Sequence, residues 1–196
     1  MLSKTFVMLA APGMIGKSYA AKKICERYPG VALLENDLLM HDIFADAGLK
    51  NPTSVSINKV AEWRDAVNAT SADCDALIRA KHFEWFRKHE DASLFVADGY
   101  PYMLKWYRQQ VLKGLQETKC ELDCRLLQYY PPMKEQARRR GLKYKQWGWE
   151  TKSISFHETE LKKSWKDFEL PVDERLQFAK VDDIFLAEIT MHIMSR

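Results

Sequence analysis

This sequence lacks long apolar runs, paired cysteines and internal repeats, and each absence narrows what the protein can be. No apolar run reaches the roughly 20 residues of a membrane-spanning helix, so we expect a soluble, cytoplasmic protein with no membrane partner. The four cysteines include no C-x-x-C pair and have no further zinc ligands nearby, which favours buried free thiols in a reducing compartment. The five histidines share no metal-ligand spacing, and we interpret them as surface or helix-face residues.

A large charge excess of one sign is also missing. The chain has 30 Lys and Arg against 27 Asp and Glu, and a net charge of +3 does not by itself imply a nucleic-acid partner. No low-complexity tract or repeat interrupts the globular composition. At 196 residues the chain is long enough for one domain with a small lid, and we expect residues 1–196 to form it.

The stretch around which the chain is organised follows the first apolar run, residues 6–10. A loop with proline and glycine closes on Gly16, Lys17 and Ser18, and a helix-forming run follows directly. This order of strand, loop and helix is typical of a phosphate-binding loop, in which main-chain N–H groups and the helix dipole bind phosphate. Lys17 supplies a cation for the β- and γ-phosphates, and the Ser18 hydroxyl can bind Mg²⁺. The residues predicted to bind the nucleotide are Pro12, Gly13, Met14, Ile15, Gly16, Lys17, Ser18 and Tyr19.

Two positions depart from the usual loop pattern. Ala11 stands where the pattern begins with glycine, and Met14 stands at a second place where many such loops have glycine. A positive φ at Met14 would cost about 1 kcal/mol, so the loop either accepts that strain or takes another shape. The alternative interpretation is a chance Gly-Lys-Ser sequence after a buried strand.

Five short apolar stretches predict strands, and helix-forming sequence separates them. The predicted strands are residues 6–10, 31–34, 93–98, 120–128 and 175–181. The predicted helices are 17–28, 38–50, 57–70, 72–90, 102–117, one from 131 into 141 and a last one at 183–194, with further helical parts between 142 and 170. This alternation predicts a three-layer α/β domain with a parallel sheet. Cys120 and Cys124 should then face the same side of the fourth strand.

Two carboxylates follow predicted strands at the edge where the loop also lies. Asp37 comes just after the second strand and Asp98 ends the third, and parallel sheets bind ligands at the carboxyl ends of their strands. Phosphoryl transfer requires a phosphate cradle, a metal ion, a base and mobile cations. Ser18 would hold Mg²⁺, Asp98 would reach the ion through water, and Asp37 would accept the proton of an acceptor hydroxyl. Arg138, Arg139 and Arg140 would supply the cations, and Arg138 would also contact the nucleotide.

Each of these assignments has a simpler structural alternative. Asp37 can cap the helix that follows it, and Asp98, before Gly99, can serve only as a turn residue. Consecutive arginines are also common at a solvated helix end, where the helix dipole favours positive charge.

With these residues identified, the chain resembles P-loop kinases of the bacteriophage polynucleotide kinase type, which are similar to 5-hydroxymethyluracil DNA kinases and zeta-toxin-like kinases. The segments that carry the resemblance fall in the family's order: KTFVMLAAPGMIGKS, ENDLL after Pro29-Gly30, LFVADG and PPMKEQARRRG. The resemblance implies a P-loop NTPase fold with a five-stranded parallel sheet in the order 2-3-1-4-5, a helical lid, and ATP and Mg²⁺ as cofactors. It also implies the host cytoplasm as the location if a phage encodes the protein.

The resemblance assigns roles to single residues. Lys17 and Ser18 match the residues for phosphate and Mg²⁺, Asp98 matches the acid on the third strand, and Asp37 matches the general base. Arg139 falls on the catalytic arginine of the lid. The catalytic residues implied in this way are Lys17, Asp37 and Arg139.

The acceptor side departs from the family. Met40 stands where the family has an arginine that holds the acceptor's phosphate, which puts in doubt the recognition of a 5′ end that carries a 3′-phosphate. The resemblance covers the first 50 residues and the region 93–141. Residues 51–92 and 142–170 have no counterpart, and these would shape the acceptor site.

A second informative segment is basic and aromatic. From Lys134 to Lys152 it has seven Lys and Arg against two Glu, with aromatic residues between them. Basic residues track phosphates and aromatic rings stack on exposed bases, at about 1–3 kcal/mol per base. This favours a single strand or an extruded base as partner, whereas a lid whose tryptophans pack on the core and whose lysines face water is the alternative. The residues predicted to bind the acceptor are Asn36, in the polar cluster that ends the second strand, and, within a lid at about 138–170, Arg140, Lys143, Tyr144, Trp147 and Trp149.

These features predict an ATP- and Mg²⁺-dependent kinase that phosphorylates a hydroxyl of DNA. The acceptor would be a 5′-hydroxyl end or the hydroxymethyl group of a modified pyrimidine. A kinase for a nucleoside or nucleoside monophosphate is the alternative within the same class. A regulatory P-loop ATPase module without an acceptor is the alternative from another class.

Overall fold

The computed structural model describes residues 4–49, 60–118, 120–172 and 175–182. The strands in these residues are β1 (Lys4–Ala10), β2 (Val31–Glu35), β3 (Leu94–Gly99), β4 (Leu122–Tyr129) and β5 (Gln177–Val181). The helices are α1 (Lys17–Arg27), α2 (Asn36–Asp46), α3 (Val60–Asn68), α4 (Cys74–Lys88), α5 (Lys105–Gln116), α6 (Met133–Gln146) and α7 (Ile154–Trp165). A 3₁₀ turn, η2 (Tyr100–Met103), joins β3 to α5.

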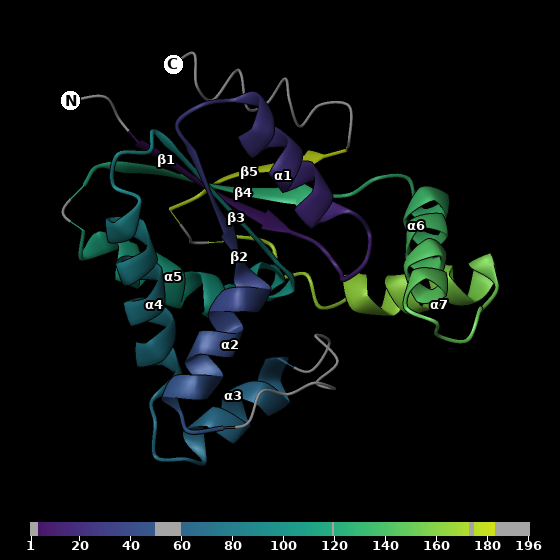
Figure 1. The fold of residues 1–196 in the computed structure, drawn as a ribbon, viewed down its shortest axis with the longest axis horizontal. Coiled ribbons are helices and arrows are strands. Elements are labelled where there is room, and N and C mark those ends of the chain that lie inside the picture. The colour runs from purple at the N-terminus through teal and green to yellow at the C-terminus, as the bar shows by residue number, and fades with distance from the viewer. Residues whose placement is uncertain (1–3, 50–59, 119, 173–174, 183–196) are drawn as a thin grey trace.

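The sheet is parallel and has the strand order β2-β3-β1-β4-β5, which confirms the order that the family resemblance implies (Figure 1). The central strand β1 pairs with β3 and β4, and its last residue, Ala10, lies opposite Gly99 and Gln128. At the end of β2, Glu35 lies opposite Asp98. The carboxyl ends of these four strands therefore meet at one edge, where ligands of such sheets bind.

Helices cover both faces of the sheet, which is why β1 is apolar on both sides. On one face α2, α4 and α5 enclose an aromatic core in which Phe86 stacks on Phe95 with ring centroids 4.4 Å apart. On the other face α1 packs through Ile24, and α6 and α7 add Ala137 and Leu161. A parallel sheet covered on both faces requires nearly continuous apolar strands, and β1 and β3 satisfy this. Among the residues that the structure describes, no helix is both long enough and apolar enough to cross a membrane.

The helices α6 and α7 project from the rest of the molecule beyond the carboxyl end of β4 (Figure 1). Pro131 and Pro132 precede α6, which then runs through Gly141 to Gln146. Gly141 allows the two helices to approach closely, because a Cβ at this residue would lie 3.4 Å from Cδ2 of His157. α7 begins after Ser153, whose Oγ accepts a hydrogen bond from the main-chain N–H of Phe156 at 3.2 Å.

Several predicted boundaries differ from the structure. The helix expected from residue 102 begins at Lys105, because the 3₁₀ turn that contains Pro101 comes first. The helix expected to run into 141 continues to Gln146, and the projecting unit begins at Met133 rather than at 138. The helix expected at 183–194 lies outside the described residues.

The interpretation of the cysteines was wrong for Cys120. The fourth strand begins at Leu122 rather than at 120, so Cys120 precedes it and is exposed. It does not share a strand face with Cys124 and is not a buried thiol. Cys74 is the buried thiol, and burial raises its pKa to about 12.

Two histidines lie on helix faces, but these faces are buried. His82 is 0% exposed and His157 is 1% exposed. Nδ1 of His82 lies 2.8 Å from the carbonyl oxygen of Ile78, and Nε2 lies 3.0 Å from the hydroxyl of Tyr102. Because a carbonyl oxygen can only accept, Nδ1 carries the proton and Nε2 accepts from Tyr102. His82 is therefore a satisfied structural histidine.

Candidate active site

The loop between β1 and α1 has a backbone suited to anion binding. Met14 and Gly16 have positive φ values of 67° and 100°, and Ile15 between them is fully buried. Met14 therefore accepts the left-handed strain, about 1 kcal/mol, that the sequence raised as one of two possibilities. Within the described residues no side chain caps α1, and its first turn has no acidic residue. The first N–H groups of α1 are thus left for a ligand, and the helix dipole favours an anion there.

Lys17 and Ser18 meet Asp98 at the end of β3. Ser18 Oγ donates a hydrogen bond to Asp98 Oδ2, and the Lys17 ammonium is close enough to lower the pKa of Asp98. Lys17 is 6% exposed and Asp98 is 3% exposed. Burial is the largest effect on Asp98 and raises its pKa, because it penalises the charged form, whereas Lys17 and Ser18 act in the opposite direction. The pairing of β1 with β3 brings these residues together across 80 positions of sequence.

The oxygen atoms of this group fit Mg²⁺. Asp98 Oδ1 is buried and has no hydrogen-bond partner in the described part of the chain. A carboxylate oxygen with free lone pairs beside a serine hydroxyl offers the hard oxygen ligands that Mg²⁺ prefers, with phosphates and water as its other ligands. A cation at this place would also offset the cost of burying the Asp98 carboxylate. Ser18 and Asp98 are the residues that would hold Mg²⁺.

Asp37 lies in the first turn of α2 at the same edge. It is exposed, and its negative charge is near enough to raise the pKa of Asp98. Glu35, not Asp37, occupies the cap position of α2, and Asp37 makes no hydrogen bond to any described residue. The capping role considered for Asp37 therefore does not apply. Its carboxylate is therefore exposed near Asp98 and is not used in capping.

Asn36 anchors the start of α2 rather than facing solvent. It is 1% exposed, and its Oδ1 accepts a hydrogen bond of 2.7 Å from the hydroxyl of Tyr107 on α5. Its Nδ2 has no partner among the described residues. Gly99 is required beside it, because a Cβ there would lie 2.7 Å from Cβ of Asn36. The bond between Asn36 and Tyr107 thus holds the first turn of α2, which carries Asp37, in place.

Met40 packs where the family resemblance implies a phosphate-binding arginine. Its Sδ lies 3.6 Å from the hydroxyl of Tyr107, so the side chain is used between α2 and α5. The sequence of α2, NDLLMHDIFAD, contains three Asp and no Lys or Arg. This helix is therefore unfavourable to a phosphate on the acceptor.

The three consecutive arginines of α6 point in three directions, because each residue of a helix is rotated by about 100° from the last. Arg139 faces the loop: its Nη1 donates to the carbonyl oxygen of Ile15 at 3.2 Å and to the hydroxyl of Tyr129 at 2.8 Å. Arg138 is exposed and binds Glu135. Arg140 is 8% exposed, lies over the ring of Tyr144 at 6.0 Å, and interacts electrostatically with His157 and Glu160 of α7.

Sequence reasoning missed Glu135, which holds two of these arginines. Its carboxylate accepts two hydrogen bonds of 2.7 Å from Arg138 and one of 2.8 Å from Arg139. These bonds lower the pKa of Glu135 to about 2. The spacing of three and four residues between Glu135 and the arginines was the available signal, because such residues are neighbours on a helix.

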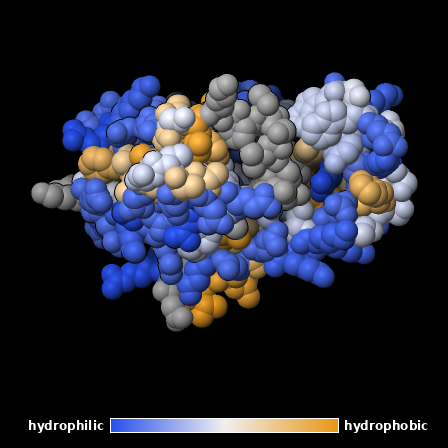
Figure 2. All heavy atoms as spheres, turned by 90° about the horizontal axis from the view of Figure 1, so that it is seen from below, coloured by the Kyte–Doolittle hydropathy of each residue, from blue (hydrophilic) through white to orange (hydrophobic). Residues whose placement is uncertain are grey.

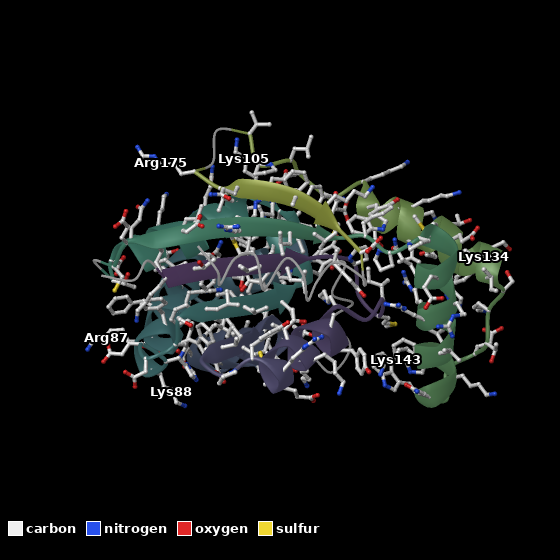
Figure 3. The ribbon with its side chains drawn as sticks, turned by 90° about the horizontal axis from the view of Figure 1, so that it is seen from above. Arg87, Lys88, Lys105, Lys134, Lys143 and Arg175 are labelled. Atoms are coloured by element: carbon white, nitrogen blue, oxygen red, sulfur yellow. The ribbon has the colours of Figure 1, made fainter. Side chains whose placement is uncertain are left out.

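A cavity of about 850 Å³ lies between α1 and α6 and opens beside the loop. Met14 and Gly16 line its end at the loop, and Tyr19, Arg138 and Lys143 line its walls. Lys134 and Lys143 mark the two ends of α6 in Figure 3. Tyr19 is 69% exposed, so one aromatic face is open to a ligand. The volume lies within the range of about 300–1,000 Å³ that is usual for small-molecule sites.

The far end of α6 carries exposed aromatic side chains. Trp147 is 52% exposed and Trp149 is 48% exposed, so the alternative in which these tryptophans pack on the core is wrong. Seen from below, the molecule is mostly hydrophilic, and pale, weakly polar side chains gather at the α6–α7 end (Figure 2). Tyr144 contacts Trp149 at a centroid distance of 5.0 Å.

The strand order, the loop and the helix that follows it decide the architecture. The chain has a three-layer P-loop NTPase fold. No protein-family model and no curated protein matches the chain.

Solved structures share the fold. The chain is similar to a tunicamycin resistance protein from Deinococcus radiodurans, with 12% identity, 98% of this chain and 94% of that chain covered, and a TM-score of 0.52. A candidate kinase from Chloroflexus aurantiacus has 10% identity, coverage of 100% and 98%, and a TM-score of 0.54. A sugar kinase from Janibacter has 14% identity, coverage of 98% and 95%, and a TM-score of 0.52. At these identities the likeness shows the fold alone.

Proposed function

We propose that this protein is an ATP- and Mg²⁺-dependent kinase that transfers the γ-phosphoryl group to a hydroxyl of a nucleic acid. The observation that carries the proposal is the meeting of Lys17, Ser18 and Asp98 at one edge of the sheet, with Asp37 near Asp98. This is the set of groups that phosphoryl transfer requires, and it lies on a fold shared with kinases.

ATP would bind along the loop. The N–H groups at the start of α1 and the Lys17 ammonium receive the β- and γ-phosphates. Ser18 and Asp98 hold Mg²⁺, which when bound neutralises phosphate charge. The cavity between α1 and α6 receives the nucleoside, where Tyr19 offers a ring for stacking and Arg138 lines the wall.

The chemical step follows from these positions. Asp37 accepts the proton of the acceptor hydroxyl, and the oxygen forms a bond to the γ-phosphorus. The bond from that phosphorus to the β–γ bridging oxygen breaks, and ADP leaves with the electron pair. Arg139, already at the loop through its bond to Ile15, stabilises the charge of the transferred group.

Two observations support a nucleic-acid acceptor that presents no phosphate near Asp37. The basic segment of α6 carries exposed tryptophans, which suits phosphates and bases together. The helix α2 has no Lys or Arg, and Met40 is packed against Tyr107. A hydroxymethyl group on a pyrimidine base of DNA fits this better than a 5′ end with a 3′-phosphate.

A second candidate is a kinase for a neutral small molecule such as a sugar or a nucleoside. It is favoured by the same lack of cations on α2 and by the likeness to a sugar kinase. A regulatory ATPase module is less favoured, because Asp37 is exposed and its charge acts on Asp98, at the sheet edge where the loop lies.

The test offers γ-labelled ATP with hydroxymethylated DNA, 5′-hydroxyl oligonucleotides, nucleosides, nucleoside monophosphates and sugars. Label should follow hydroxymethylated DNA. Asp37→Asn should abolish transfer and leave ATP binding intact, because only the proton acceptor is lost. Asp42→Asn is the matched control, since Asp42 is an exposed carboxylate five residues further along α2.

The outcomes separate the candidates. Label on sugars or nucleosides alone would replace the nucleic-acid acceptor by the second candidate. Transfer that survives Asp37→Asn would remove Asp37 from the role of base. Release of free phosphate with no labelled acceptor would favour the ATPase module.

A further inference from the structure

The aromatic side chains at the end of α6 form a surface that the chemistry at the loop does not use. Trp147 and Trp149 are half exposed, and their rings meet at a centroid distance of 5.0 Å and an angle of 67°. Phe156, at the start of α7, is 40% exposed. Trp147 lies eight residues beyond Arg139, about 12 Å along the helix, so this surface is remote from the loop.

Beneath these rings lie polar groups without partners. His157 is 1% exposed, and neither of its ring nitrogens has a hydrogen-bond partner in the described part of the chain. Nε of Arg140, which is 8% exposed, also lacks one. Buried polar groups are normally bonded, because leaving one unpaired costs free energy. Of these nitrogens, Nε of Arg140 and one ring nitrogen of His157 carry hydrogen, so acceptor oxygens of a ligand would satisfy both donors.

Tyr144 connects the two features. Its ring lies 4.8 Å from the ring of His157, 5.0 Å from that of Trp149 and 6.0 Å from the guanidinium carbon of Arg140. It therefore contacts the buried pair Arg140 and His157 and the exposed ring of Trp149 at the same time. Because Arg140 and His157 are buried, a ligand that reaches them from the tryptophan side requires this ring to move.

The charge around this place selects the ligand. Between Lys134 and Lys152 the chain carries seven Lys and Arg and two Glu, and the Glu160 carboxylate of α7 interacts electrostatically with Arg140. Lys143 and Lys145 end α6, and Lys152 lies over the ring of Phe156 at 6.0 Å. A basic surface with open aromatic faces matches single-stranded nucleic acid, whose bases are free to stack while its phosphates meet the cations. In a duplex the base faces are already stacked and unavailable.

We infer that the end of the α6–α7 pair is a nucleotide subsite for single-stranded or locally unpaired nucleic acid, in which a base stacks on Trp147 and Trp149 and the adjoining phosphate is received by Arg140 and His157. The inference rests on the proposed function, since it states how the acceptor strand is held. In this subsite the protein binds a second nucleotide of the acceptor strand, which does not react and lies away from Asp37.

The test measures binding of a fluorescent oligothymidylate with phosphates at both ends, which offers no acceptor hydroxyl at its ends and no modified base. Fluorescence anisotropy with the full-length protein should show binding to this probe and at least tenfold weaker binding to the matching duplex. The double variant Trp147→Ala, Trp149→Ala should weaken binding of the single strand by about 5- to 150-fold per stacked base. Phe178→Ala is the control, because Phe178 is a 40% exposed aromatic residue on β5, outside this surface.

Two further variants separate a binding role from a structural one. His157→Phe removes the two unpaired nitrogens, so it should leave the melting temperature equal or higher and still weaken binding of the probe. Arg140→Gln should reduce the slope of log affinity against log salt concentration by about 0.7, the value for one phosphate contact on a single strand. The tryptophan variants should leave that slope unchanged.

Several results would overturn the inference. These are absence of binding to the probe, equal affinity for single strand and duplex, or unchanged affinity in the tryptophan and His157 variants. A dimer in light scattering that the tryptophan variants dissociate would assign the surface to contact between copies instead. Probe binding without phosphoryl transfer to any acceptor would refute the proposed function and leave the subsite. Transfer to hydroxymethylated DNA without probe binding would refute the subsite and leave the proposed function.

Discussion

Arg139 donates a hydrogen bond to the main-chain carbonyl oxygen of Ile15, 3.2 Å away, although 124 residues separate them in the sequence. The same guanidinium is held by the Tyr129 hydroxyl and the Glu135 carboxylate. A cation is therefore positioned at the loop in the free protein. Ordering an arginine in advance lowers the entropic cost of using it when phosphate charge develops.

Replacement of Arg139 tests this arrangement. Arg139→Ala should lower kcat by about 10²–10³-fold, because a preorganised donor to the transferred group is lost. Lys134→Ala, an exposed cation on the same helix (Figure 3), should leave kcat unchanged. Steady-state kinetics with purified variants measures both. Equal kcat values for the two variants would contradict the role of Arg139.

Glu135 is expected to act as a positioning residue. Glu135→Gln should lower kcat by about tenfold and change the free energy of unfolding by less than about 0.5 kcal/mol, since exposed ion pairs contribute little. The two arginines lower the pKa of Glu135 to about 2, so its carboxylate is charged at neutral pH. It loses that charge only as the pH falls toward 2. The ratio of variant to wild-type kcat should therefore be constant between pH 5 and 9. A ratio that changes across this range would show that another group holds Arg139.

Asp98 should be needed for Mg²⁺ but not for folding. Asp98→Asn should raise the Mg²⁺ concentration for half-maximal activity by about 10–100-fold. Its melting temperature should be equal or higher, because burial already disfavours the charged form of this carboxyl. Mg²⁺ titration of activity and thermal unfolding without nucleotide measure the two effects. Asp91→Asn, at an exposed turn, is the control. If both variants reach half-maximal activity at the same Mg²⁺ concentration, Asp98 is not a ligand of the ion.

The two glycines of the loop should respond differently to a methyl group. Gly16 has a φ of 100°, and a Cβ there would lie 3.0 Å from Nη1 of Arg139, so Gly16→Ala should destabilise the protein by about 1–2 kcal/mol. A Cβ at Gly13 would meet no described atom within 4 Å, and Gly13→Ala should leave stability nearly unchanged. Urea unfolding of both variants without nucleotide checks this contrast. Similar losses would mean that the loop backbone differs from the one described.

Buried His82 should make the protein less stable in mild acid. Burial lowers the pKa of His82 from 6.5 to about 4, so between these values the unfolded chain binds a proton that the folded chain does not. Stability therefore falls as the pH falls from 6.5 to about 4, by on the order of 3 kcal/mol, at 1.36 kcal/mol for each unit of pKa. His82→Gln should lose most of this dependence in urea unfolding measured at several pH values. His41→Gln, at an exposed histidine of α2, should retain it.

The predictable part of the candidate site is the part that is local in sequence. The run from Phe6 to Ser18 specifies a strand, a loop and a helix start by itself, and the structure has all three. The expectation that Asp37 and Asp98 share an edge with the loop followed from a general rule of parallel sheets, and their electrostatic coupling agrees with it. A run of three identical residues does not by itself indicate which one faces the loop. The family resemblance singled out Arg139, and Arg139 is the one that bonds Ile15.

The sequence alone determined the alternation of strands and helices, the phosphate-binding loop and the two carboxylates, because these depend on residue type and on short spacings. The tertiary structure decided that Ser18 bonds Asp98, that Arg139 rather than Arg140 reaches the loop, and that Trp147 and Trp149 remain exposed. Strand pairing brings Ser18 to Asp98, 80 positions away in the sequence. The orientation of α6 about its own axis brings Arg139 to Ile15, 124 positions away. Such contacts form only when the whole sheet is assembled, so no local pattern encodes them.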